Sequence, residues 1–151
     1  MRVAVACDHG GFPLKAMVLE IIRQGGDTAL DLGTNSAEAV DYPDFAEKVG
    51  HALQNGTADR GILICGSGVG ACIAANKMKG ILAGVCHDTY SAHQAVEHDN
   101  INVLCLGARI IGPELAREIV IAYLGAVFSN EERHIKRLAK VKKLEDELRK
   151  S

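Results

Sequence analysis

Buried strands and amphipathic helices alternate along this chain, as the spacing of its hydrophobic and polar positions indicates. Short apolar runs predict strands at residues 3–7, 28–32, 61–65, 82–86 and 103–106. Apolar residues at helical spacing predict helices at residues 13–23, 42–54, 70–78, 90–97 and 113–124. Five strand and helix units in succession predict an α/β fold, in which helices cover both faces of a five-stranded parallel sheet.

The C-terminal segment, residues 129–151, departs from this alternation. Ser129 and Glu132 have the spacing of a capping box, which predicts that a helix begins there. Its apolar positions form a stripe at Ile135, Leu138, Val141, Leu144 and Leu148. The highly charged remainder favours an exposed arm, so we expect this helix to pack on its own sheet or on a second subunit. Residues 1–151 are expected to form a single domain.

The composition narrows the functional classes. A net charge of -2, from 17 Lys and Arg against 19 Asp and Glu, provides no general attraction to nucleic acid or to a membrane surface. The five cysteines form no C-x-x-C pair and lie in or beside apolar runs, which is typical of reduced thiols and argues against structural zinc. We find no signal peptide or bilayer-spanning apolar run and predict a cytoplasmic protein.

A glycine-rich loop, Cys65-Gly66-Ser67-Gly68-Val69-Gly70, follows the third predicted strand. Its G-x-G-x-G spacing fits neither the dinucleotide fingerprint nor the P-loop. The glycines allow close approach of the backbone to a ligand, and the helix that follows can stabilise an anion or the Cys65 thiolate. The alternative is a tight turn with an inert buried cysteine, and the loop alone does not decide between the two.

Polar groups also follow the first predicted strand, where Asp8 and His9 precede two glycines. In open parallel sheets, ligands bind beyond the carboxyl ends of the strands, so these side chains are expected on the same rim as Cys65. Asp8 would orient a substrate hydroxyl or cap the next helix. His9 would hydrogen-bond within the turn or contact a bound anion. Arg109 follows the fifth predicted strand at this rim.

Basic residues open the C-terminal helix. Arg133 and Arg137 are four positions apart and flank His134, so both guanidinium groups lie on one face. Such a pair suits a phosphate in a chain without a P-loop. The alternative is a solvated basic face offset by Glu131 and Glu132.

A polar segment, residues 98–102, precedes the fifth predicted strand and is expected to be a loop. It contains His98, Asp99 and Asn100. A histidine that gives or takes a proton near neutral pH, beside amide and carboxylate groups, has the chemistry that opening a cyclic sugar requires.

Together these motifs extend over nearly the whole chain. They are Asp8-His9-Gly10-Gly11, Asp41-Tyr42-Pro43, the glycine loop with Ile73-Ala74-Ala75-Asn76-Lys77, the His98 segment with Asn102-Val103-Leu104, Gly107-Ala108-Arg109, and Arg133-His134-Ile135-Lys136-Arg137. In order and spacing the chain resembles the type B ribose-5-phosphate isomerase family, within the group that includes galactose-6-phosphate and allose-6-phosphate isomerases.

This resemblance implies a doubly wound, Rossmann-like domain without a nucleotide, a metal or an organic cofactor. It implies a homodimer or homotetramer with shared active sites that interconverts ribose 5-phosphate and ribulose 5-phosphate through an enediolate. Cys65 would transfer the proton, Ser67 and the N–H groups of the glycine loop would hold the enediolate oxygens, and His98 would assist ring opening. The implied substrate-binding residues are Asp8, His9, Tyr42, Gly66, Gly68, Gly70, Asp99, Asn100, Arg109, Arg133, His134 and Arg137, with His9, Arg109, Arg133, His134 and Arg137 around the phosphate.

Two residues depart from the pattern of the family. Some members have a catalytic glutamate where this chain has Ala71, which leaves the proton transfer to Cys65. Asp99 stands where asparagine is common, and its carboxylate would turn away, bind a sugar hydroxyl or mark another sugar. The alternatives are therefore isomerisation of a six-carbon sugar 6-phosphate, a non-catalytic nucleotide- or flavin-binding module, and an accessory subunit that needs a related partner.

Overall fold

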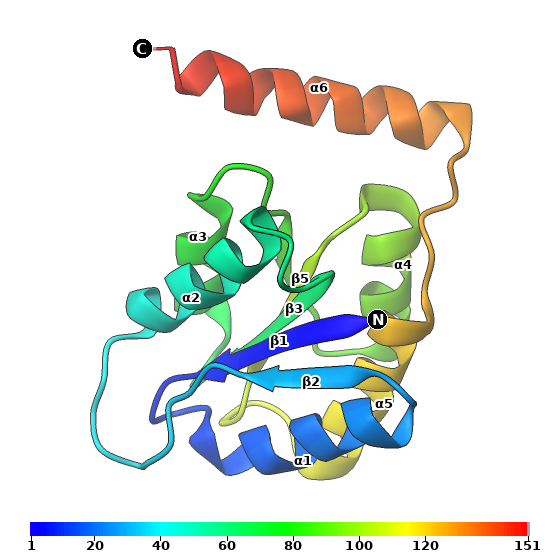
Figure 1. Cartoon of the computed structure of the whole chain (residues 1–151). Helices are drawn as coiled ribbons and strands as arrows, with labels where there is room; N and C mark the ends of the chain where they lie inside the picture. Colours follow the sequence, from blue (N-terminus) through cyan, green and yellow to red (C-terminus); the bar gives the residue numbers. More distant parts are fainter. Residues whose placement is uncertain (151) are drawn as a thin grey trace.

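Five parallel strands form one sheet in the order β2-β1-β3-β5-β4 in the computed structural model, which describes residues 1–150 (Figure 1). The strands are β1 (Arg2–Cys7), β2 (Thr28–Asp31), β3 (Arg60–Cys65), β4 (Ala83–Val85) and β5 (Val103–Gly107). This confirms the predicted five-stranded parallel sheet. The chain first moves outward from β1 to β2 and then crosses back to β3, so the strand order reverses between β1 and β3.

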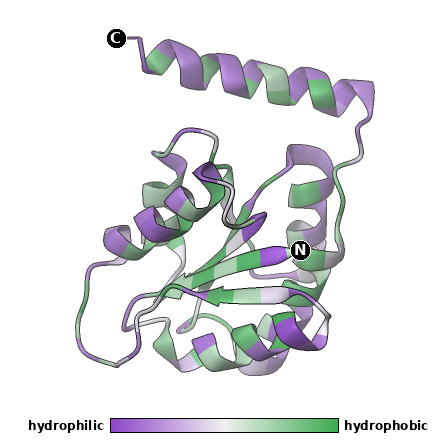
Figure 2. Cartoon of the chain, viewed as in Figure 1, coloured by the Kyte–Doolittle hydropathy of each residue, from purple (hydrophilic) through white to green (hydrophobic). Residues whose placement is uncertain are grey.

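Helices cover both faces of the sheet, as predicted (Figure 1). One face carries α1 (Phe12–Gln24), α4 (Thr89–Asp99) and α5 (Pro113–Gly125), and the other carries α2 (Tyr42–Gln54) and α3 (Val69–Asn76). Side chains of each strand alternate between the two resulting cores. Ile62 and Ile64 of β3 pack toward α1, α4 and α5, whereas Leu63 and Cys65 pack toward α2 and α3. The hydropathy colouring shows the strands as the apolar centre of the fold (Figure 2).

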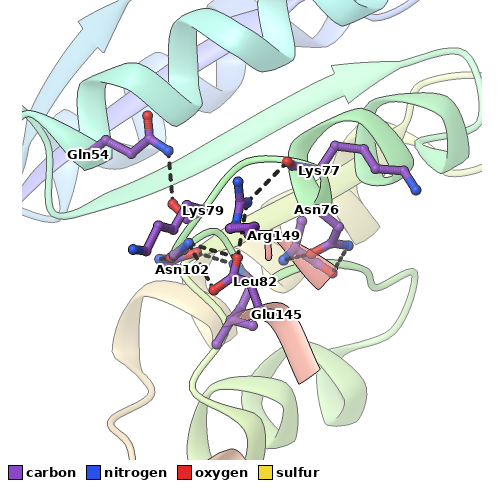
Figure 3. Close-up of polar contacts among 10 residues, drawn as sticks. Gln54, Asn76, Lys77, Lys79, Leu82, Asn102, Glu145 and Arg149 are labelled. Atoms are coloured by element: carbon purple, nitrogen blue, oxygen red, sulfur yellow. Dashed lines mark hydrogen bonds and ion pairs between the residues drawn. The ribbon is translucent and has the colours of Figure 1, made fainter. Parts of the chain in front are cut away.

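The last helix, α6 (Glu132–Leu148), projects from the body of the domain as an arm (Figure 1). Gly80 N–H donates to Glu145 Oε1 at 3.1 Å, and Arg149 Nη2 donates to the Lys77 carbonyl at 3.4 Å (Figure 3). These contacts tie the far end of the arm to the loop after α3. Leu144 and Leu148 on α6 nevertheless remain 61% and 76% exposed.

The predicted capping box at the start of α6 is wrong. Glu131 is the N-cap residue and its side chain makes no capping hydrogen bond. Ser129 Oγ lies 2.5 Å from His134 Nδ1 and accepts a hydrogen bond from the Glu131 N–H. The Ser129 hydroxyl therefore contacts the buried imidazole of His134 instead of capping the helix. The helix begins three residues after Ser129.

Arg60, at the start of β3, holds the end of α5. Its guanidinium donates to the carbonyls of Tyr123 and Ala126 at 2.7 Å each and lies 5.3 Å from the centre of the Tyr123 ring. Arg60→Met removes these donors from helix-end carbonyls, so we expect the free energy of unfolding to fall by about 2 kcal/mol. Urea denaturation measures it, with Arg23→Met on the exposed end of α1 as the control, and equal losses in both variants would contradict this role.

Within residues 1–150, no helix is long and apolar enough to cross a membrane.

Candidate functional site

Two glycine contacts bring the turn after β1 against the loop after β3. A Cβ atom at Gly11 would overlap the Ile64 carbonyl, and one at Gly10 would lie 3.1 Å from the Gly66 nitrogen. Only glycine permits this approach. Asp8, His9 and the Cys65 loop therefore share one rim at the carboxyl ends of β1 and β3, as the sequence predicted.

Cys65 ends β3 as a buried residue, 4% exposed, beneath the glycine loop. The Gly68 N–H donates to Cys65 Sγ at 3.0 Å. Gly68 has φ +83° and is the N-cap residue of α3, a conformation that favours glycine and turns its N–H toward the sulfur. The Val69 N–H donates to Ser67 Oγ at 3.2 Å. The sulfur thus lies beside the N-terminal end of α3 and accepts the backbone N–H of its N-cap residue.

Tyr42 and Arg109 flank the loop. A Cβ atom at Gly70 would lie 2.7 Å from Tyr42 Cζ, and one at Gly66 would lie 3.1 Å from Arg109 Nη1. The Arg109 N–H also donates to the Gly66 carbonyl at 3.0 Å, which fixes the segment after β5 beside the loop. An aromatic ring and a guanidinium group therefore border the glycine loop.

The two polar residues after β1 are held in defined orientations. Asp8 is buried and its Oδ1 accepts the Gly11 N–H at 3.0 Å, so it stabilises the turn, while Gly11 itself is the N-cap residue of α1. His9 Nδ1 accepts the Val40 N–H at 3.2 Å. In a neutral ring the proton then resides on Nε2, which leaves an N–H donor for an anion at this rim.

His87 is a further group at this edge that the sequence analysis did not select. It follows β4, and its Nε2 accepts the Gly107 N–H at 2.9 Å. Burial lowers the pKa of His87, which favours the neutral, hydrogen-bond-accepting ring. A Cβ atom at Gly107 would lie 2.6 Å from the Ser67 carbonyl carbon, so His87 supports the strand end on which the glycine loop rests. Its position after a strand was the available signal.

Four other predicted residues form a second cluster between α4 and α6, namely His98, Asp99, His134 and Arg137. His98, Asp99 and Arg137 line one cavity of about 240 Å³. His134 is 2% exposed and stacks on His98 with ring centres 4.2 Å apart and planes at 27°. Burial, together with the nearby His98 and Arg133, lowers the pKa of His134.

The polar segment at residues 98–102 begins within a helix, which corrects the predicted loop. His98 and Asp99 form the last turn of α4, and Asn100 caps it with φ 51°. Asparagine tolerates this left-handed conformation, which ends the helix just before β5.

Arg133 lies apart from the cavity of Arg137, because its Nε pairs with Glu131 Oε2 at 3.1 Å and its side chain lines a separate hollow with Lys136.

The two clusters lie at opposite edges of the sheet. Cys65 is the last residue of β3, at the carboxyl ends of the strands, whereas His98 precedes β5, at their amino ends. Helix α3 begins beside Cys65 and ends at Asn76, which lines the His98 cavity. Eight residues of helix span about 12 Å. One chain therefore does not bring Cys65 and His98 together around a single small substrate.

Comparison with known proteins places the chain in a family. Residues 3–141 match the family described as ribose/galactose isomerase. The chain is 44% identical to ribose-5-phosphate isomerase B of Escherichia coli over 95% of this chain and 96% of that protein. It is 45% identical to D-erythrulose-4-phosphate isomerase of Pectobacterium atrosepticum over 85% of each.

Solved structures agree with these sequence matches. Ribose-5-phosphate isomerase B of Clostridium thermocellum superposes with a TM-score of 0.95 at 42% identity, over 98% of this chain and 99% of that one. The Mycoplasma genitalium ribose-5-phosphate isomerase B with bound ribulose-5-phosphate has a TM-score of 0.91 at 41% identity, over 97% of both chains. The chain therefore belongs to the ribose/galactose isomerase family.

Proposed function

We propose that this protein interconverts ribose 5-phosphate and ribulose 5-phosphate as an aldose–ketose isomerase. The observation that carries the proposal is the hydrogen bond of 3.0 Å from the Gly68 N–H to Cys65 Sγ, in a glycine loop against which Arg109 and Tyr42 pack. The bound ribulose-5-phosphate in the Mycoplasma genitalium relative supports this choice of substrate.

In this proposal the Cys65 thiolate removes the proton from C2 of the open-chain aldose. The electron pair forms a C1–C2 double bond and charge develops on the carbonyl oxygen, giving an enediolate. A second proton moves from the C2 hydroxyl to the C1 oxygen, and return of the first proton to C1 gives the ketose. Ser67 Oγ and N–H groups of the glycine loop hold the developing charge, and each well-placed donor contributes about 3 kcal/mol to the transition state.

Opening of the furanose form precedes this step. It transfers one proton from the C1 hydroxyl to the ring oxygen as the C1–O4 bond breaks. In its protonated form His98 gives the ring oxygen a proton and becomes neutral, and the neutral imidazole then accepts the C1 hydroxyl proton through water. In the same proposal, Asp8 and Tyr42 border the sugar.

A second copy of the chain completes the site. His98 and Arg137 are at the opposite edge of the sheet from Cys65, so the second copy must supply them. A cavity of about 870 Å³ between the loop after α3 and the apolar side of α6 offers room for the docking of that copy. We therefore propose a homodimer, alone or as half of a homotetramer, with two equivalent shared sites.

The phosphate would lie between the two copies. One copy supplies His9 and Arg109 beside the glycine loop, and the other supplies Arg137 from α6. Arg133 would join them by leaving its pair with Glu131, whereas His134 is 2% exposed and stacks on His98. The chain acts as one domain of residues 1–151, in which residues 129–151 serve oligomerisation, although Ser151 lies outside the described residues. The five free cysteines support a reducing compartment, the cytoplasm.

A substrate panel tests the function. We expect kcat/KM for ribose 5-phosphate to exceed that for allose 6-phosphate and galactose 6-phosphate by at least about tenfold. One carbon more or less in a binding pocket changes the free energy of transition-state binding by about 1–3 kcal/mol. Asp99 keeps a six-carbon substrate as the second candidate, since its carboxylate lines the same cavity as Arg137. A higher kcat/KM for either hexose phosphate would replace the pentose assignment.

Arg137→Ala should raise KM for ribose 5-phosphate by about tenfold to a hundredfold and change kcat little. The guanidinium forms charge-assisted hydrogen bonds with the phosphate, each worth about 1.5–3 kcal/mol, in both the ground state and the transition state. Steady-state kinetics measure the effect. Lys140→Ala, on an exposed position of the same helix, is the control, and an unchanged KM in Arg137→Ala would remove this residue from the phosphate site.

A further inference from the structure

We propose that His87 is a positioning residue that holds the glycine loop after Cys65 in the geometry that proton transfer requires. The inference rests on the proposed function, because that function assigns the N–H groups of the loop to the enediolate oxygens. His87 is half-buried just after β4, and it acts on the loop through Gly107, the last residue of β5.

The hydrogen bond between Gly107 and His87 has a single possible direction. A backbone N–H only donates, so His87 Nε2, at 2.9 Å from the Gly107 nitrogen, accepts and carries no proton. Burial lowers the pKa of His87 against the opposite effect of Asp88, which favours the neutral ring that can accept. Strand β4 ends at Val85, so the imidazole takes the place of a ladder partner for the buried Gly107 N–H.

Gly107 also lies against the glycine loop. A Cβ atom at Gly107 would lie 2.6 Å from the Ser67 carbonyl carbon, and one at Gly68 would lie 3.3 Å from the Gly107 nitrogen. The nitrogen that His87 holds is therefore beside the residue whose own N–H donates to Cys65 Sγ at 3.0 Å. A continuous series of contacts thus joins the imidazole to the sulfur.

The two residues after Gly107 bind the same loop. The Ala108 N–H donates to the Cys65 carbonyl at 2.9 Å, and the Arg109 N–H donates to the Gly66 carbonyl at 3.0 Å. The bond to His87 fixes the start of this segment. Loss of that bond lets the segment and the loop shift together, and loop N–H groups stabilise a developing charge only when they are already in place.

His87→Gln and His87→Asn test the inference as a matched pair in the full-length protein. The amide oxygen of Gln reaches about as far as imidazole Nε2 and can accept the Gly107 N–H, whereas the amide of Asn reaches only about as far as Nδ1. Tyr123→Phe is the control for a general loss of stability. It removes a buried hydrogen bond of 3.1 Å from the Tyr123 hydroxyl to the Gly61 carbonyl, near the amino end of β3.

We expect kcat for ribose 5-phosphate to fall about tenfold in His87→Asn with KM changed less than about twofold, because the loop N–H groups act on charge that develops in the transition state. His87→Gln should retain most of the wild-type kcat. Tyr123→Phe should lower the free energy of unfolding, measured in urea, and keep kcat. Hydrogen–deuterium exchange of the Gly107 amide, followed by NMR, should be slow in the wild type and His87→Gln and faster in His87→Asn.

Fast exchange of the Gly107 amide in the wild type, or faster exchange in His87→Asn with unchanged kcat, would overturn the inference. An equal loss of kcat in Tyr123→Phe would also overturn it, since stability alone would then explain the effect. Failure of the wild type to isomerise any sugar phosphate, while the Gly107 amide exchanges as expected, would instead overturn the proposed function.

Discussion

Cys65→Ala is expected to lower kcat for ribose 5-phosphate isomerisation by about a thousandfold or more, with little change in KM. The substitution removes the sulfur that accepts the proton, while the glycine loop and the distant arginines still bind the substrate. Progress of the reaction in D₂O measures the step directly. Wild-type enzyme should introduce solvent deuterium into the sugar, and the variant should not.

Cys72 provides a demanding control for this prediction. It lies on α3, one turn after the glycine loop, and a hydrogen bond with the Cys105 thiol lowers the pKa of Cys72 to about 7. A lowered pKa makes Cys72 a second candidate for the reactive thiol. Its Sγ donates to the Ala83 carbonyl at 3.4 Å, away from the rim of Asp8 and His9, so Cys72→Ala should retain turnover. The reverse pattern would transfer the proton-transfer role to Cys72.

The fold was largely predictable because its central strands β1, β3 and β5 are buried and its helices have regular apolar spacing. The helix at residues 42–54 begins and ends as predicted. Strand β4 is shorter than predicted, since Leu82 N–H donates to the Asn102 side chain at 2.8 Å instead of joining the ladder. Such side-chain competition for a backbone group depends on a residue distant in the sequence.

The candidate site was predictable only in part. The carboxyl ends of β1, β3 and β5 meet at one rim because all strands are parallel, which places Asp8, Cys65 and Arg109 together. Contacts such as Tyr42 against Gly70 depend on how α2 packs on α3 and have no local signal. The position of His98 before a strand, rather than after one, was a usable signal that it lies at the other edge.

Because Cys65 and His98 lie at opposite ends of the strands, we expect isomerase activity to be recovered when two inactive variants are mixed. Cys65→Ala and a double variant, His98→Gln with Arg137→Ala, each destroy every site of a homodimer. In a mixed dimer, one site combines both defects and the other has an intact Cys65 facing an intact His98 and Arg137. Random mixing makes about half of the dimers mixed, so about a quarter of wild-type activity should return.

The experiment requires exchange of subunits, by refolding from urea or by co-expression, and separate tags on the two variants to isolate the mixed dimer. The isolated mixed dimer is expected to have about half of wild-type kcat, with wild-type KM, because one of its two sites is intact. Each variant refolded alone controls for spontaneous recovery.

Assay of that isolated mixed dimer with ribose 5-phosphate tests the central claim most directly, because it asks at once whether Cys65 reacts and whether a second copy completes its site. We predict about half of wild-type kcat. Activity no higher than that of either parent variant would contradict a site shared between two copies of this chain.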